Sequence, residues 1–409
     1  MNLLKRVLYI TFGVTIVLYA IQAFSPLRLT GDGIAYLTLA DSAASNGVIQ
    51  ALRRPGFAFP KGYPLFIFLF MKAGIFSSAT VVISNLLLFV TALILSYRTL
   101  VALGFERILS AVACLLTLLS FAAVKFITQG MSDFLFYMLA ACTCWLMTLE
   151  GRTKWLAILP CAACAIEVRF IGLALIGAIA VIAWPAVKKH PIALAAAGVL
   201  GAGLIVAGAL AGHHYLSSNL QMFHNNGFWR FAGKNLRSHL QDFGELMVNV
   251  PLTKLPPWTY GAMLAFGGLT LICFLVGIVR VGGRSRWLAG YLISYSLLIF
   301  PWPYTDPRFW TPAMPFVLVA MYLGAKAIWK SLPDAAIAAY CVLFCLAGFG
   351  ALAYSTSLTF AGPQFAYRYG DGRLTSTYLA HCSSTPPDFE ERDALHLLQR
   401  YEWHCPEAQ

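Results

Sequence analysis

Long apolar segments separated by short polar turns recur along most of the chain. A helix needs about 20 predominantly apolar residues to cross the hydrocarbon core of a bilayer. The pattern predicts about eleven transmembrane helices, at residues 7–24, 78–98, 108–124, 133–149, 155–167, 170–187, 191–212, 259–279, 287–301, 310–329 and 335–354. Residues 64–76 are also apolar, but this short run predicts a helix lying in the membrane interface.

Composition agrees with this pattern, because 59% of the residues are hydrophobic and 11% are charged. In a soluble globular domain about a quarter of all residues are charged. The sequence therefore predicts an all-α polytopic membrane protein.

The distribution of charge predicts which way the helices run. If the N-terminus lies inside, the inner turns hold three acids (Glu106, Glu150 and Asp334) and these bases: Lys5, Arg6, Arg98, Arg107, Arg152, Lys154, Lys188, Lys189, Arg280, Arg284, Arg286, Lys326 and Lys330. Basic inner turns follow the positive-inside rule, which predicts an N-in, C-out topology. The net charge of +12 then reflects topology and does not indicate a nucleic-acid partner.

We expect residues 1–354 to form the membrane module, and its outer loops at 25–77 and 213–258 to roof a cavity on the outer face. Residues 355–409 would be a small extracytoplasmic segment. At roughly 55 residues, this segment is short for an independently folded domain without a staple. Cys382 and Cys405 lie in it, and a disulfide between them is predicted because that compartment is oxidising.

Ionisable and aromatic residues gather where the predicted outer loops meet the membrane. The set comprises Asp32, Tyr36, Arg53, Arg54, Lys61, Tyr63, Asp133, Glu167, Arg169, Trp302, Asp306 and Arg308. Ionisable groups at membrane depth are costly and usually line a cavity or a pathway. These residues therefore predict a site on the outer side.

Four elements of this set follow one another in a specific order. Asp32 and Tyr36 open the first outer loop, and Pro60-Lys-Gly-Tyr-Pro-Leu65 closes it. Ser132-Asp-Phe-Leu-Phe136 opens a middle segment, and Arg308-Phe-Trp-Thr-Pro-Ala-Met-Pro315 opens a late one. Together they resemble the GT-C superfamily of integral membrane glycosyltransferases, which includes protein O-mannosyltransferases and the aminoarabinose transferases of lipid A.

The resemblance implies a GT-C-type transmembrane helix bundle and a polyprenyl-phosphate sugar as donor. It places Asp32 at the position of the catalytic acid-base. The sequence contains no Gly-rich phosphate-binding loop of the kind that would indicate a nucleotide-sugar donor. The chain departs from many members in having Gly33 where they place a second acid, and in its short C-terminal segment. The first departure weakens a two-acid metal site, and the second weakens recognition of the acceptor by a large outer domain.

Two acids are candidates for catalysis, each with a structural alternative. Asp32 would take the proton of the acceptor hydroxyl, or it caps a helix beginning near Gly33. Asp133 would orient the acceptor or sugar, or hold a divalent cation together with Asp32. Its alternative is an acid favoured by the dipole at a helix start. No metal ligand is assigned.

Cations should meet the phosphate of the donor, where negative charge develops as the bond breaks. The candidates are Arg308, Arg169, Lys61, Arg54 and Arg53, although the last two would equally suit lipid headgroups. The alternative for the first two is a local ion pair, Asp306 with Arg308 and Glu167 with Arg169. The residues predicted to contact substrate are Tyr36, Tyr63, Trp302, Asp306 and Glu167.

The sequence thus predicts an inverting glycosyltransferase of the bacterial inner membrane whose site faces the periplasm. The acceptor would be a lipid-linked glycan, lipid A, a cell-wall polymer or a protein, and the surrounding membrane lipids are further partners. Two other classes stay open, a lipid or sugar transporter or flippase and a non-catalytic envelope scaffold. Scattered glycines within the apolar segments and the paired outer charges favour a transporter, which should also show repeats and broken helices near the midplane. The sequence shows no internal repeat, and its ionisable residues gather on one face with few charges near the midplane.

Overall fold

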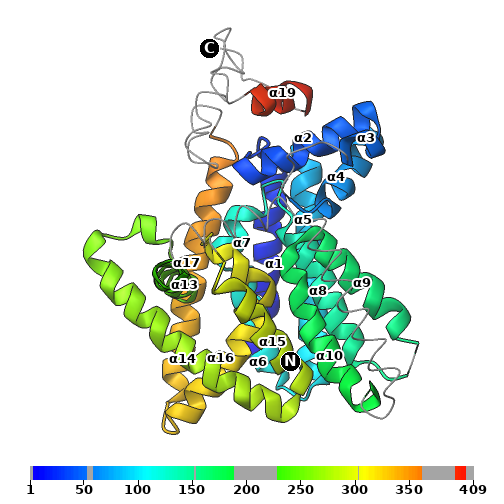
Figure 1. The fold of residues 1–409 in the computed structure, drawn as a ribbon. Coiled ribbons are helices and arrows are strands. Elements are labelled where there is room, and N and C mark those ends of the chain that lie inside the picture. Colours follow the sequence, from blue (N-terminus) through cyan, green and yellow to red (C-terminus); the bar gives the residue numbers. More distant parts are fainter. Residues whose placement is uncertain are drawn as a thin grey trace.

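The computed structural model of the chain describes residues 3–52, 59–151, 153–187, 228–302, 304–361 and 392–401, and no strand occurs among them. Its helices pack as one bundle (Figure 1). They are α1 (Leu3–Ile21), η1 (Gln22–Phe24), α2 (Gly31–Asn46), α3 (Val48–Leu52), α4 (Gly62–Lys72), α5 (Ser78–Ala102), α6 (Arg107–Leu118), α7 (Phe121–Phe126), α8 (Asp133–Thr148), α9 (Trp155–Val168), η2 (Phe170–Leu173), α10 (Ala174–Val187), α13 (Phe228–Val248), η3 (Leu252–Lys254), η4 (Pro257–Thr259), α14 (Tyr260–Arg284), α15 (Arg286–Ile299), η5 (Pro307–Ala313), α16 (Met314–Ile328), α17 (Asp334–Leu358) and α19 (Arg392–Tyr401), where η denotes a 3-10 helix.

Five helical segments in the described part of the chain are long and apolar enough to cross a membrane. They are Lys5–Phe24, Ser78–Ala102, Pro257–Arg284, Pro307–Ile328 and Asp334–Leu358. Further apolar helices are shorter, namely Gly62–Lys72, Arg107–Leu118, Asp133–Thr148, Trp155–Val168 and Phe170–Trp184. A helical protein of membrane type is therefore confirmed, whereas eleven crossings and their orientation stay predictions. The predicted crossing at 191–212 lies outside the described residues.

One predicted crossing, 108–124, is interrupted. Helix α6 ends before Leu119, and the Ser120 hydroxyl begins α7 by accepting a hydrogen bond from the backbone N–H of Ala123 at 3.2 Å. The apolar run around this point hides the interruption from the sequence pattern.

Asn249 stabilises this interruption from a distant part of the chain. Its Oδ1 accepts from the backbone N–H of Phe121 at 2.6 Å, and its Nδ2 donates to the carbonyls of Leu119 at 3.0 Å and Phe344 at 2.9 Å. Asn249 is 1% exposed and has a φ of 62°. Asn tolerates this left-handed conformation better than most residues do, so one buried amide joins α7, α17 and the end of α13.

Glycines allow α14 and α16 to pack closely against each other. A Cβ added to Gly277 would overlap the carbonyl oxygen of Ala320, and one added to Gly324 would overlap that of Cys273. Small residues let helix backbones approach in this way within membranes.

We therefore expect Gly277→Ala to destabilise the fold by about 1–3 kcal/mol, because the added methyl meets backbone that cannot move aside by rotating. Gly268→Ala is the matched control, since it lies on the same helix with no atom within 4 Å of the added carbon. Thermal unfolding of the two variants in detergent measures the difference. Equal midpoints would contradict the packing of α14 on α16.

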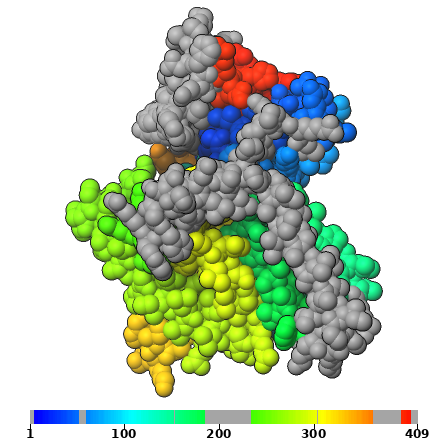
Figure 2. Space-filling view, in the orientation of Figure 1, coloured from blue at the N-terminus to red at the C-terminus, as the bar shows by residue number. Residues whose placement is uncertain are grey.

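The C-terminal helix α19 lies against α2 (Figures 1 and 2). The Asp41 carboxylate of α2 accepts hydrogen bonds from the Tyr401 hydroxyl and, at 2.9 Å, from the Arg400 guanidinium. The Tyr401 ring also meets that of Phe76 edge to face at 4.9 Å. Part of the predicted tail therefore braces the first loop. Cys382 and Cys405 lie outside the described residues.

Candidate functional site

Asp32 lies in the first turn of α2, and the cap of that helix is a different residue. The Thr30 hydroxyl accepts from the backbone N–H of Gly33 at 3.3 Å. The prediction of Asp32 as the helix cap is therefore wrong, because Thr30 already satisfies the N–H that a cap would serve. The Asp32 carboxylate is turned to another partner.

That partner is Arg308, at the start of η5. Its Nη2 donates to Asp32 Oδ2 at 2.7 Å, and its Nε lies 3.6 Å from Asp306 Oδ2. Asp306 also accepts from the backbone N–H of Arg308 at 2.9 Å, which fixes the start of the 3-10 helix. The guanidinium lies over the rings of Phe126, at 5.1 Å, and Phe309, at 5.2 Å. The predicted pair of Asp306 with Arg308 is therefore present, and Arg308 also reaches Asp32.

A second pair joins Asp133, the first residue of α8, to Arg169, which follows the end of α9. Arg169 Nη1 donates to Asp133 Oδ1, and the guanidinium lies 5.3 Å from the centre of the Phe309 ring. Asp133 is 3% exposed, and its Oδ2 is buried without a hydrogen-bond partner. The predicted partner of Arg169 was wrong, because Glu167 is exposed and the carboxylate that meets Arg169 is that of Asp133.

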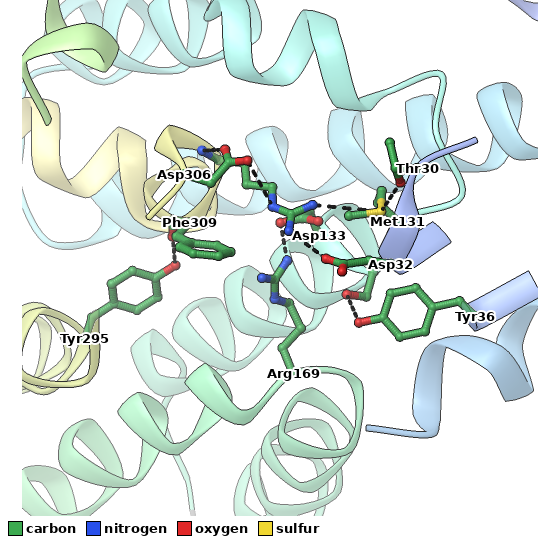
Figure 3. A network of polar contacts seen from close by, with 11 residues as sticks. Thr30, Asp32, Tyr36, Met131, Asp133, Arg169, Tyr295, Asp306 and Phe309 are labelled. Atoms are coloured by element: carbon green, nitrogen blue, oxygen red, sulfur yellow. Dashed lines mark hydrogen bonds and ion pairs between the residues drawn. The ribbon is translucent and has the colours of Figure 1, made fainter. Parts of the chain in front are cut away.

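These groups line one cavity of about 550 Å³. Its charged side chains are those of Asp32, Asp133, Arg169, Asp306 and Arg308, and Figure 3 shows the labelled acids and Arg169 pointing toward one another. Another part of the wall is apolar and includes Phe136, Leu173, Leu298 and Ile299. The cavity therefore combines paired charges with a surface suited to a hydrocarbon chain.

Charges in the cavity are nearly balanced. Among the described lining residues, Asp32, Asp133 and Asp306 face Arg169 and Arg308. Each guanidinium is already in contact with a carboxylate. An anionic ligand that binds either arginine must therefore share it with a carboxylate or displace that carboxylate.

The other predicted site residues divide between the cavity wall and its surroundings. Tyr36 and Trp302 line the cavity. Tyr63 is fully buried behind Tyr36, with ring centres 5.4 Å apart, and does not line it. Lys61, which precedes α4, and Glu167 do not line it either. Arg53 and Arg54 lie outside the described residues.

Sequence reasoning missed the support that α13 gives to the cavity wall. Asn235 Nδ2 and His239 Nε2 hold the backbone carbonyl of Trp302 at 3.1 and 3.0 Å. Burial lowers the pKa of His239, so its imidazole is neutral, with the Nε2 proton donated to that carbonyl. The expectation that the loop 213–258 roofs the cavity is not met by the described residues of α13, since none of them lines it.

Asp242, one turn beyond His239 on α13, has an unusually high pKa for a carboxyl group. Burial, reinforced by the nearby charges of Asp306 and Glu245, raises the pKa of Asp242 to about 8. Its Oδ2 lies 3.8 Å from Nδ1 of His239. At neutral pH we therefore expect a mostly protonated Asp242 behind the cavity wall.

The described residues contain no group of three or more His, Cys, Asp and Glu side chains placed to hold a metal ion. Asp32 and Asp133, the pair predicted as an alternative cation site, each face an arginine instead. A divalent cation at these two acids stays a prediction.

Comparison of the chain with protein-family models, with curated proteins and with solved structures finds no match.

Proposed function

We propose that this protein is a membrane glycosyltransferase of GT-C type, which moves a sugar from a polyprenyl-phosphate donor to an extracytoplasmic acceptor. The observation that carries the proposal is the meeting of two arginine–aspartate pairs, from four separate parts of the chain, in one partly apolar cavity. Ionisable groups gathered in a protein rich in apolar helices mark a functional site. A phosphate attached to a hydrocarbon chain fits both parts of that cavity.

The proposed reaction is a single displacement at C1 of the sugar. The acceptor hydroxyl oxygen attacks C1 of the sugar, and its proton passes to the Asp32 carboxylate. The bond between C1 and the phosphate oxygen breaks, and its electron pair stays on the phosphate. Attack opposite the leaving phosphate inverts the configuration at C1, and the products are the glycosylated acceptor and polyprenyl phosphate.

Arg308 and Arg169 would stabilise the charge that develops on the leaving phosphate. Both guanidinia contact the ring of Phe309 in η5. This shared contact places the two positive charges close together at the cavity. Asp133 lines the cavity, and its buried Oδ2 has no hydrogen-bond partner. We assign to this oxygen a hydrogen bond from a sugar hydroxyl, which donor binding would have to bring within its reach. The aromatic side chains of Tyr36 and Trp302 on the wall would contact the sugar ring.

The apolar wall, which includes Leu298 and Ile299, would hold the first isoprenoid units of the donor. In this proposal the chain crosses the bacterial inner membrane about eleven times with its N-terminus inside. The cavity then opens to the periplasm, where lipid-linked glycans, lipid A, wall polymers and proteins are the acceptors.

The test is turnover by the purified protein in nanodiscs, given a panel of polyprenyl-phosphate sugars and an envelope lipid extract as acceptor source. Released polyprenyl phosphate is measured by mass spectrometry. We expect Asp32→Asn to reduce the rate by about 10²–10⁴, because it removes the general base. Glu150→Gln, which removes an exposed carboxylate far from the cavity, should retain the wild-type rate.

Other outcomes identify other functions. Turnover that survives Asp32→Asn moves the base to Asp133. Specific donor binding without turnover, combined with movement of the lipid across the bilayer, identifies a flippase. If the protein neither binds nor turns over any donor in the panel, the remaining function is that of a non-catalytic envelope scaffold.

A further inference from the structure

The group proposed as the base is engaged in this structure. Asp32 Oδ2 accepts a hydrogen bond from Arg308 at 2.7 Å. The guanidinium occupies Oδ2 and directs the carboxylate toward Arg308. An oxygen engaged in this way is not free to receive the proton of an acceptor hydroxyl.

Arg308 does not depend on Asp32 for its position. Its guanidinium lies over two rings, those of Phe126 and Phe309, at 5.1 and 5.2 Å. Its Nε lies 3.6 Å from Asp306, whose own position is fixed by capping η5. Ring contacts and a second acid would keep the guanidinium in place when Asp32 leaves.

The two ion pairs of the cavity differ in how easily they can separate. The Asp32 side chain is 37% exposed, whereas that of Asp133 is 4% exposed. Once separated from its arginine, the Asp32 carboxylate can be hydrated, whereas the carboxylate of Asp133 would be left buried without its partner. Exchange of partners should therefore occur at Arg308 and Asp32, and the pair of Asp133 with Arg169 should stay intact.

We propose that the phosphate of the donor takes the place of Asp32 on Arg308 and thereby releases Asp32 to act as the base. This inference rests on the proposed function, and it adds an order to the reaction. The donor binds first, and the acceptor hydroxyl gives up its proton to a carboxylate that donor binding has set free. A protein without donor keeps its base paired with Arg308.

The experiment measures the affinity of the full-length protein in nanodiscs for undecaprenyl phosphate. Because Asp32 competes with the phosphate for Arg308, we expect Asp32→Asn to bind roughly three- to tenfold more tightly than wild type. The gain combines the end of that competition with the loss of repulsion between carboxylate and phosphate.

Two further variants separate competition from charge alone. Asp306→Asn removes a second negative charge beside Arg308, at 3.6 Å against 2.7 Å for Asp32, and Asn still caps a helix well. We expect it to tighten binding less than Asp32→Asn does, because Asp306 stays on Arg308 in the donor complex. Glu150→Gln, whose carboxylate is exposed and far from the cavity, should bind as wild type does.

The remaining outcomes overturn the inference in distinguishable ways. Equal tightening in Asp32→Asn and Asp306→Asn would show general repulsion and no displacement. Unchanged or weaker binding in Asp32→Asn, with wild type binding and turning over normally, would reject displacement and leave the glycosyltransferase standing. Folded protein that binds no undecaprenyl phosphate in any variant would reject both proposals.

Discussion

Replacing Arg308 by Ala is expected to reduce turnover of the lipid-linked sugar by about 10²–10³, because a fixed charge opposite the leaving phosphate is lost. The loss has a second part, since Asp32 and Asp306 would then lack the guanidinium between them. Arg308→Lys should recover little, because an ammonium cannot contact two acids and two rings as the flat guanidinium does. The initial rate of polyprenyl phosphate release measures both variants.

The control for this experiment is Arg280→Ala, which removes an exposed arginine of α14 and should leave the rate unchanged. Turnover of Arg308→Ala within about threefold of wild type would contradict the role of Arg308 in holding the phosphate. Full activity of Arg308→Lys would show that a positive charge alone is sufficient.

The helical membrane character was predictable because apolar segments of sufficient length have few alternative structures in a bilayer. The interruption of the segment 108–124 was not, because Ser120 and its neighbours look like part of a continuous apolar run. Asn249, more than 120 residues away in the chain, supplies the hydrogen bonds that make the interruption stable. A pattern read along the chain carries no information on such a distant partner.

The site shows the same limit. Asp32, Asp133, Arg169 and Arg308 were predicted to lie together, because all stand at the ends of apolar segments on one side. Their pairing was predicted from neighbours in sequence, which succeeded for Asp306 with Arg308 and failed for Arg169. Which helix ends face one another depends on packing, and spacing along the chain does not determine it.

Supporting residues carried still weaker signals. Phe309 contacts both guanidinia and Phe126 contacts that of Arg308, yet a phenylalanine in an apolar protein indicates nothing by itself. His239 and Asn235, which hold the Trp302 carbonyl, belong to a loop that was predicted to cover the cavity. They support its wall from behind, a role that follows from the placement of α13 and not from the residue types.

The pair of Asp133 with Arg169 is expected to contribute stability as well as chemistry, and single replacements should separate the two contributions. Arg169→Met removes the guanidinium that contacts the buried Asp133 and should lower the free energy of unfolding by about 3–5 kcal/mol. Asp133→Leu should cost less, because the Arg169 side chain is 18% exposed against 4% for Asp133 and can reach solvent. Unfolding by SDS titration in mixed micelles measures both losses.

The double variant, Asp133→Leu with Arg169→Met, is the decisive comparison. Replacing a buried ion pair by apolar side chains of similar size is often neutral, so most of the lost stability should return. Turnover should not return, since the double variant lacks both the phosphate-binding guanidinium and the free Oδ2 that we assign to the sugar. Additive losses of stability would mean that the two side chains act independently, and recovered turnover would remove both from the proposed reaction.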